Sequence, residues 1–220
     1  MKPAILSSLI LVSGLCFACD LSFAKTITAP CRDITCNKNI HHIDGHLYTV
    51  QIPQNEFNLV LNSPDQEKSH WCWAASLQMI LQLIGSHMNQ ADIVRKVHQK
   101  VDNTPATPEE MVKFINGWHK NDNGQNILLF SYIEYFIPQI IFDLANGFPV
   151  ILDMKVDRKN NHSYLITSAR FLYFDNKPPI LTSVTARDPW KGNPKFKIFN
   201  FDTISGHAHL IIGVREYIPQ

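Results

Sequence analysis

The chain has 220 residues, of which 45% are hydrophobic and 18% are charged. This composition can bury a substantial core and excludes a disordered or fibrous protein, so we expect one folded domain. Lys and Arg total 20 against 19 for Asp and Glu, which leaves a formal net charge of +1. Such a balance gives no electrostatic reason to bind nucleic acid, and we expect no nucleic-acid partner.

The first 24 residues are typical of a secretory signal peptide. Lys2 precedes an apolar run of about fourteen residues, from Ile5 to Ala18. Ser22 and Ala24 then supply the small side chains that signal peptidase recognises at positions −3 and −1. We therefore expect cleavage after Ala24 and an exported mature chain, either periplasmic or secreted.

The length of the apolar run argues against a membrane-spanning protein. Spanning a bilayer takes about 20 apolar residues, and neither this run nor any later segment reaches that length. We expect no membrane segment once the signal is removed. A lipoprotein signal is the alternative, because Cys16 and Cys19 end the run, although neither has Leu three positions ahead of it.

Two of the remaining cysteines are predicted to form a disulfide. Cys31 and Cys36 lie close together in a polar stretch of an exported chain, where the compartment is oxidising. Cys72 is then left without a partner. An odd thiol of this kind is either a small buried core residue or a reactive group.

The chain after residue 46 contains helices first and strands later. Hydrophobic periodicity and end signals predict helices at residues 71–84, 89–101, 107 to about 119, and 138–146. They predict strands at residues 47–52, 58–61, 126–133, 149–156, 163–174, 179–187, 195–201 and 209–218. This segregation predicts an α+β fold, with a helical half packed against an antiparallel sheet and any cleft between the two halves.

The segment WCWAASLQMILQLI, residues 71–84, is apolar at nearly every position. It therefore predicts a helix buried at the centre of the fold. Cys72 lies at the beginning of this helix, where free N–H groups and the helix dipole favour an anion and hence the thiolate. On position alone, a chemically inert core cysteine is an equal alternative.

Gln66 lies six residues before Cys72, on the loop that enters this helix. Its amide can join the Cys72 backbone N–H in holding a developing oxyanion, although an ordinary solvated glutamine is the alternative. Gln66 followed by Cys72, Trp73 and Ala74 at the head of a buried helix resembles the papain-like cysteine peptidases. The resemblance implies a helical half and a sheet half with the active site in the cleft between them.

The resemblance also implies a histidine on a strand of the sheet half, which takes the thiol proton and later gives it to the leaving amine. Of the ten histidines, His162 best combines a preceding turn with a following apolar strand, and His207 and His209 are its rivals. The family places Asn or Asp on a later strand. Asp188 comes 26 residues after His162, whereas the eleven residues after His209 contain neither Asn nor Asp.

Asp188 is predicted to orient His162. An Asp-Pro turn is its ordinary alternative, and Asp175 or Asp202 are possible substitutes. Trp190 favours Asp188, because the family has an indole two residues beyond the orienting residue that covers the bond to the histidine. Asp in place of papain's Asn agrees with bacterial branches of the family, namely effector proteases of the avirulence type and leader peptidases of bacteriocin exporters.

The three histidines of HHIDGH, residues 41–46, are a weaker signal. They have no placed thiol or carboxylate beside them, so we interpret them as a solvated loop and expect no metal and no cofactor. The resemblance covers roughly residues 50–215. We therefore divide the chain into a signal peptide at 1–24, an N-terminal segment at 25–46 and a papain-like peptidase domain at 47–220.

The predicted function is that of a secreted, monomeric bacterial cysteine endopeptidase acting on a protein or peptide. Cys72 is the nucleophile, His162 the base and then the acid, Asp188 the orienting residue and Gln66 the oxyanion donor. No transporter or nucleotide-binding region follows, which favours a free enzyme over an exporter-attached one. The alternatives are an acyl transferase or deamidase with the same residues, and a binding or toxin-partner module without catalysis.

Overall fold

The computed structural model describes residues 37–156, 161–175, 177–205 and 208–216, the last of these by its backbone alone. All of them belong to the second of two units into which the chain divides, residues 33–220. The predicted signal peptide and the predicted disulfide between Cys31 and Cys36 lie outside the described residues.

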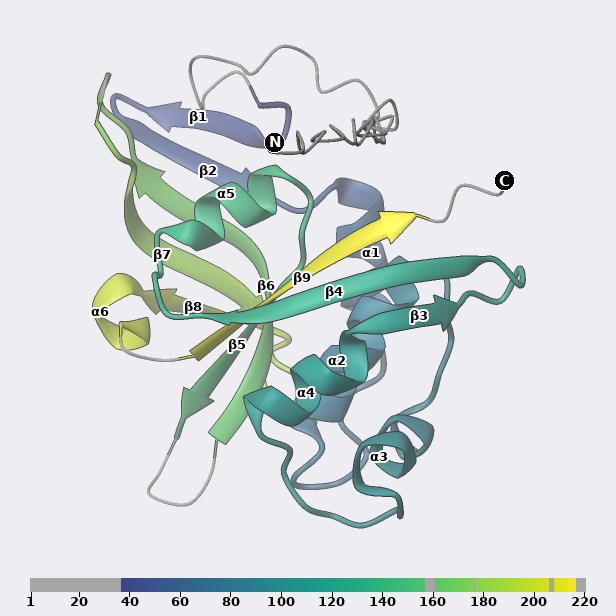
Figure 1. Ribbon diagram of the computed structural model, residues 1–220. Helices are drawn as coiled ribbons and strands as arrows, with labels where there is room; N and C mark the ends of the chain where they lie inside the picture. Colours follow the sequence, from purple (N-terminus) through teal and green to yellow (C-terminus); the bar gives the residue numbers. More distant parts are fainter. Residues whose placement is uncertain (1–36, 157–160, 176, 206–207, 217–220) are drawn as a thin grey trace, which may run out of the picture. The chain divides into compact units, whose positions relative to one another are not determined.

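The fold contains helices and an antiparallel sheet, so the predicted α+β class is confirmed (Figure 1). The helices are α1 (Gln54–Asn62), α2 (Cys72–Leu83), α3 (Gln90–His98), α4 (Pro108–Ile115), α5 (Gln139–Ala145) and α6 (Phe201–Ile204). The strands are β1 (Ile40–Asp44), β2 (Leu47–Gln51), β3 (Gly117–Lys120), β4 (Asn126–Glu134), β5 (Val150–Lys155), β6 (Asn161–Leu172), β7 (Ile180–Arg187), β8 (Phe196–Asn200) and β9 (Ala208–Glu216). No helix in these ranges has both the length and the apolar character needed to cross a membrane.

Two sequence-based predictions of elements are wrong. Residues 58–61, predicted as a strand, belong to α1, in which Phe57 and Val60 lie one turn apart and turn inward while Leu59 is exposed. The helix predicted to reach about residue 119 ends at Ile115, because Gly117 has a φ of 127° and begins β3. The predicted start of α4 is confirmed, since Thr107 and Glu110 form a capping box.

β1 is a strand that the sequence did not predict. It forms a hairpin with β2 through a turn at Gly45, and it carries His41 and His42, which we had placed in a loop. The His42 ring packs edge-on against Tyr48. Within the described residues, no group of three or more His, Cys, Asp or Glu side chains is arranged to hold a metal ion.

β6 connects the parts of the sheet, because it pairs with β2, β5 and β7. The order β1-β2-β6-β5-β9-β4-β3 is antiparallel throughout, and β7 pairs with β6 and β8. β7 runs along β6 until Arg187 pairs with Leu165, and there it leaves the sheet. Asp188 therefore emerges beside the first residues of β6, which include His162.

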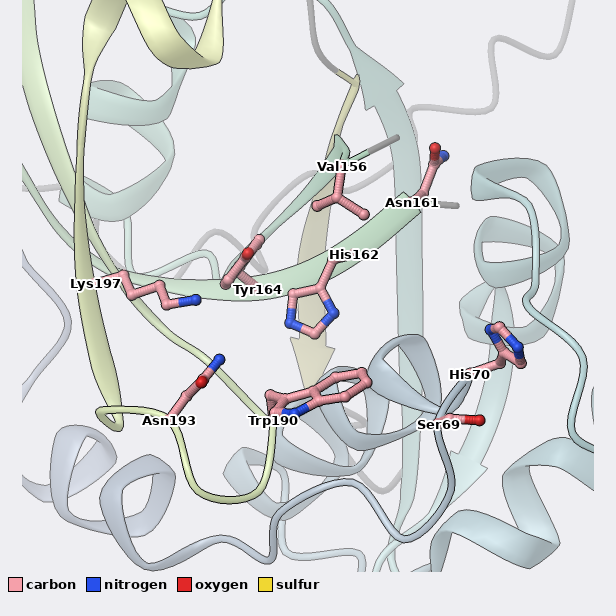
Figure 2. Close-up of a pocket in the computed structure, with 9 residues that line it drawn as sticks. All are labelled: Ser69, His70, Val156, Asn161, His162, Tyr164, Trp190, Asn193 and Lys197. Carbon is pink, nitrogen blue, oxygen red and sulfur yellow. The ribbon is translucent and has the colours of Figure 1, made fainter. Parts of the chain in front are cut away.

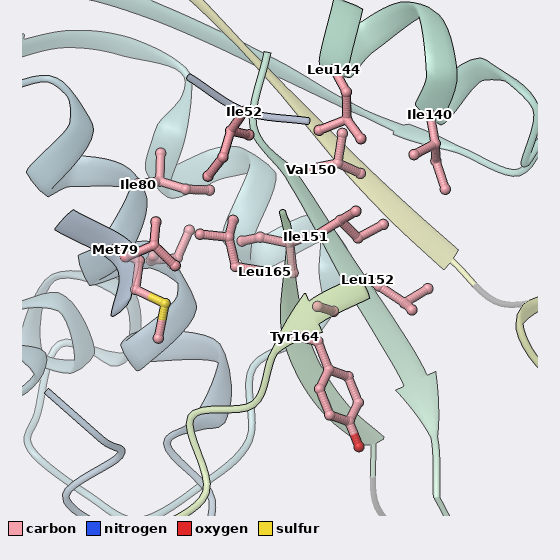
Figure 3. Close-up of a cluster of buried hydrophobic side chains, with 14 of the residues drawn as sticks. Ile52, Met79, Ile80, Ile140, Leu144, Val150, Ile151, Leu152, Tyr164 and Leu165 are labelled. Carbon is pink, nitrogen blue, oxygen red and sulfur yellow. The ribbon is translucent and has the colours of Figure 1, made fainter. Parts of the chain in front are cut away.

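The core lies on both faces of β5 and β6 (Figure 3). Every residue of β5 except the last is buried, and alternate side chains of a strand point to opposite faces of its sheet. Val150 lies near Leu144 of α5, whereas Ile151 and Leu165 lie on the side of Ile80 in α2. α2 is thus packed against β6, with Cys72 to Leu81 all buried.

A buried arginine connects the sheet to the loop between α1 and α2. Arg187, at the end of β7, has no exposed surface, and its Nη2 lies 2.6 Å from Oδ1 of Asp65. The same nitrogen is 3.4 Å from the carbonyl oxygen of Ser63. A buried guanidinium needs a partner of opposite charge, so this pair ties the two segments together, although Nε of Arg187 has no hydrogen-bond partner among the described residues.

We expect Asp65→Ala to lower the free energy of unfolding by about 3 kcal/mol, because it leaves the Arg187 guanidinium buried without its carboxylate partner. Urea denaturation followed by tryptophan fluorescence measures the loss. Asp92→Ala is the matched control, since it breaks an exposed ion pair with Arg95 and should cost about 1 kcal/mol or less. Equal losses in the two variants would contradict a structural role for the buried pair.

Candidate active site

Cys72 is the first residue of α2. The N–H groups of a helix's first turn have no acceptor within the helix, and together with the helix dipole they favour a negative charge at this end. The thiol is buried, with 5% of the residue exposed, and it forms no disulfide. Its Sγ lies 4.0 Å from the carbonyl oxygen of Asn161, the first residue of β6. The start of α2 and the start of β6 therefore meet at this point.

His162 lies between the thiol and a carboxylate. It is the second residue of β6 and is 8% exposed. Nε2 of its ring lies 2.8 Å from Oδ1 of Asp188, and the ring also hydrogen-bonds the Cys72 thiol. Because Nε2 is taken by Asp188, Nδ1 is the ring nitrogen left for the thiol. The structure thus brings together three of the residues that the sequence singled out.

His162 is positively charged at neutral pH. Burial alone lowers the pKa of its imidazole, but the hydrogen bonds to Asp188 and Cys72 outweigh burial and raise the pKa from 6.5 to about 9. This imidazolium lies beside the sulfur of Cys72 at the N-terminal end of α2.

Asp188 is fully buried, and both of its carboxylate oxygens accept hydrogen bonds. Oδ1 accepts from His162 and from the backbone N–H of Trp190, at 2.9 Å. Oδ2 accepts from Nδ2 of Asn193 at 2.9 Å and from Nζ of Lys197 at 2.7 Å. Burial by itself raises the pKa of this carboxyl, but these four donors hold it well below its ordinary range. Asp188 therefore stays ionised.

Two aromatic rings contact the His162 imidazole. Tyr164, two residues further along β6, lies edge-on at 4.4 Å between ring centroids, and Trp190 lies at 5.9 Å and 61°. Trp190 is 41% exposed, so its indole covers one side of the His162 ring and still faces the solvent. Burial, with smaller contributions from Asp188 and Cys72, raises the pKa of Tyr164 to about 12, which keeps this phenol neutral.

Gln66 braces the loop that leads to Cys72. Its Nε2 donates to the carbonyl oxygens of Lys68 and Ser69, at 2.9 and 3.1 Å. Its backbone N–H donates to the carbonyl oxygen of Pro189 at 2.8 Å, which joins this loop to the one after Asp188. The side-chain oxygen is buried and has no hydrogen-bond partner among the described residues. In this arrangement the amide N–H groups serve the loop, and an oxyanion role stays a prediction.

The two tryptophans beside the thiol are both core residues. Trp71 and Trp73 are each 1% exposed, so neither indole is open to the cleft. Their indole N–H groups donate to the carbonyl oxygens of Asp102 and Thr104, at 2.7 and 3.2 Å. They hold the start of α2 against the loop after α3.

A cavity of about 310 Å³ opens beside His162 (Figure 2). One wall comes from the loop before Cys72, and the other comes from the residue after β5, from β6 and β8, and from the loop after Asp188. The cavity therefore lies in the cleft between the helical and sheet segments. It is lined by Ser69, His70, Val156, Asn161, His162, Tyr164, Trp190, Asn193 and Lys197. A substrate bound here has direct access to the imidazole.

Sequence reasoning missed several residues of this site. Tyr164 was not among the predicted site residues, although its position two residues after His162 on a strand places it on the same face. Asn193 and Lys197 carry no local signal, because their contact with Asp188 depends on how the chain turns after β7. The rival His207 lies outside the described residues. His209 belongs to β9 and its backbone pairs with Leu152 of β5, but its side chain is also outside the described residues.

Comparisons with known proteins place the chain in a family. A family model described as the Peptidase_C39 like family matches residues 48–216, whereas no curated protein matches the chain. Among solved structures, the chain is similar to the peptidase domain of Streptococcus ComA, a bi-functional ABC transporter involved in quorum sensing. The identity is 15% over 70% of this chain and 97% of that one, with a TM-score of 0.47.

The chain is also similar to the Salmonella effector SpvD, which is represented by two variants. Their identities are 10% and 13%, over 82% of this chain and 84% and 86% of theirs, with TM-scores of 0.28 and 0.29. The family match takes in most of the chain, including Cys72, His162 and Asp188. With its antiparallel sheet and buried helix α2, this chain has a papain-like fold and belongs to the Peptidase_C39-like family.

Proposed function

We propose that this protein is an exported cysteine endopeptidase that hydrolyses peptide bonds with Cys72, His162 and Asp188. The observation that carries the proposal is the position of His162, which hydrogen-bonds the thiol at the start of α2 on one side and a buried carboxylate on the other. Family membership supports a peptidase, and the signal pattern of residues 1–24 supports export.

The reaction follows from the charges of the pair. The Cys72 thiolate attacks the carbonyl carbon of the scissile bond, and the tetrahedral intermediate carries a negative oxygen. The His162 imidazolium then gives its proton to the nitrogen, the C–N bond breaks and the amine leaves, with the acyl group held as a thioester on Cys72. Water attacks the thioester while His162 takes its proton, and the carboxylic acid and the thiolate are released.

Asp188 acts on this reaction through His162. Its hydrogen bond to Nε2 fixes which ring nitrogen faces the sulfur, and its charge stabilises the imidazolium. The oxyanion is placed next to the backbone N–H of Cys72, since that N–H lies in the first turn of α2. Gln66 is proposed as the second donor, which requires one of its amide N–H groups to turn from its loop carbonyl when substrate binds.

The direct test is cleavage of an unfolded protein. We expect the mature chain, residues 25–220, to cut casein under reducing conditions and Cys72→Ala to cut none, as measured by mass spectrometry of the fragments. If the parent cuts neither casein nor a diverse peptide library, endopeptidase activity is contradicted. Incorporation of a labelled amine into protein would then identify an acyl transferase, and its absence would favour the non-catalytic alternative.

Alkylation of Cys72 tests the assignment of the histidine. We expect His162→Ala to slow the reaction with iodoacetamide at pH 6.5 by about tenfold, because the thiolate loses its cationic neighbour. His209→Ala should leave the rate unchanged. If His209→Ala slows alkylation and His162→Ala does not, the rival histidine is the base.

The pH profile of hydrolysis should show a basic limb. Because the pKa of His162 is raised to about 9, the imidazolium persists above its usual range and is lost as the pH rises through that value. We therefore expect kcat/KM to fall above pH 9, since the proton for the leaving amine is then missing. Asp188→Ala removes a hydrogen bond that raises this pKa, so its basic limb should lie at lower pH. An unchanged limb in that variant would contradict the role of Asp188.

Gln66→Ala tests the oxyanion role. Loss of one oxyanion donor typically lowers kcat by about 100-fold with little change in KM. Gln66→Glu keeps the size of the side chain but lacks the N–H donors, so it should be as slow. If both variants keep the parent kcat and only lose thermal stability, Gln66 is a loop brace and nothing more.

A further inference from the structure

The carboxylate of Asp188 has two cationic partners. Nε2 of His162 lies 2.8 Å from Oδ1, and Nζ of Lys197 lies 2.7 Å from Oδ2. Asp188 has no exposed surface, and the Lys197 side chain is one-third exposed. An ion pair with one partner fully buried is screened far less by solvent than a surface pair. The ammonium therefore acts on Asp188, and through it on His162.

The pairing of β7 with β8 places Lys197 at this position. Lys197 lies opposite Ala186, and the backbone N–H of Asp188 donates to the carbonyl oxygen of Lys195. Asp188 and Lys197 are thus diagonal neighbours on one face of the strand pair, a separation that a long side chain can cross. Nζ also lies 5.7 Å from the centre of the Tyr164 ring, and Figure 2 shows the side chain reaching toward Tyr164 and His162.

The charges that face His162 come from three segments. The sulfur of Cys72 approaches from α2, the carboxylate of Asp188 from the end of β7, and the ammonium of Lys197 from β8. Tyr164 on β6 adds a neutral phenol. The carboxylate and the ammonium carry opposite charges. The buried guanidinium of Arg187, which donates to the backbone carbonyl oxygen of Asp188, is paired with Asp65.

Three further titratable groups lie close to His162. His70 lines the opposite wall of the cavity. Lys155 of β5 lies opposite Asn161 of β6 in the strand register. Asp153, also on β5, accepts hydrogen bonds from the side chains of Asn161 and Ser163, which point away from the sheet face that carries His162. The side chains of β9 lie outside the described residues. Among the described groups, Lys197 is the cation that contacts the triad carboxylate together with His162.

We propose that Lys197 is a positioning residue that neutralises Asp188, so that His162 is oriented by a carboxylate and ammonium pair with little net charge. The proposal rests on the peptidase function proposed above. The pair gives His162 a well-placed hydrogen-bond acceptor without the full attraction of an isolated buried carboxylate. An imidazolium held less tightly gives up its proton more readily to the leaving amine.

The test is the titration of His162 itself, followed by NMR of the histidine ring carbons in the reduced mature protein and assigned with His162→Ala. Lys197→Met removes the cation that competes for Asp188, so the pKa of His162 should rise by about one unit. Lys197→Gln removes the same charge and should give the same rise. Lys197→Arg keeps the charge and should titrate like the parent.

The double variant separates charge from structure. Asp188→Asn alone leaves the Lys197 ammonium uncompensated beside the imidazole, and the pKa of His162 should fall by about two units. Combining Asp188→Asn with Lys197→Met restores neutrality, so the pKa should recover toward the parent value. Lys191→Met, which removes an exposed lysine of the loop between β7 and β8, is the matched control and should change nothing.

The proposal is overturned if Lys197→Met and Lys197→Gln leave the His162 titration unchanged, or if the double variant titrates like Asp188→Asn alone. Cleavage of casein is followed in parallel and reports on the peptidase function separately. Expected shifts in a protein that cuts no substrate would support the charge pairing and contradict the peptidase. Cleavage with an unshifted titration would support the peptidase and contradict the role of Lys197.

Discussion

Burial of the Asp188 carboxylate is the constraint from which the site is built. An ionised carboxylate without exposed surface is stable only when its oxygens are fully supplied with donors. Those donors come from β6, from β8 and from the loop between β7 and β8, so three segments of the sheet region must converge on it. The contacts that supply Asp188 with donors also orient His162, because the His162 ring is one of these donors. The same contacts therefore stabilise the buried carboxylate and set the geometry of the proposed catalytic site.

The position of Cys72, the proposed nucleophile, depends on a different kind of contact. α2 has almost no polar face, and its burial against β6 brings the N-terminal end of the helix to the first residues of that strand. The few polar side chains of α2 are used in the same packing. Ser76 donates to the carbonyl oxygen of Ser163, and Gln78 accepts from the fully buried Gln90 of α3. The thiol and the imidazole thus meet because the helix and the strand are packed together.

The loop before Cys72 connects these two systems. Arg187 reaches Asp65 from the sheet, Gln90 holds the backbone of Asp65 and Glu67 from the helices, and Gln66 joins Pro189. Each contact is between segments far apart in the sequence. A displacement of the loop would therefore move both Cys72 and Asp188.

The sequence by itself determined the class of the fold, most helices and strands, and the order of Cys72, His162 and Asp188, since each of these has a local signal. Periodicity and turn chemistry predict a buried helix that begins with cysteine, a strand with histidine near its start, and an Asp-Pro-Trp turn. Local signals failed where packing decides the backbone, as in α1, and where a hydrogen-bonding partner is distant. Only the tertiary structure decided that Lys197 and Asn193 contact Asp188, that Arg187 is buried beside it, and that the amide of Gln66 serves its own loop. These contacts depend on strand register and loop paths, which are set by long-range packing and leave no periodic pattern in the chain.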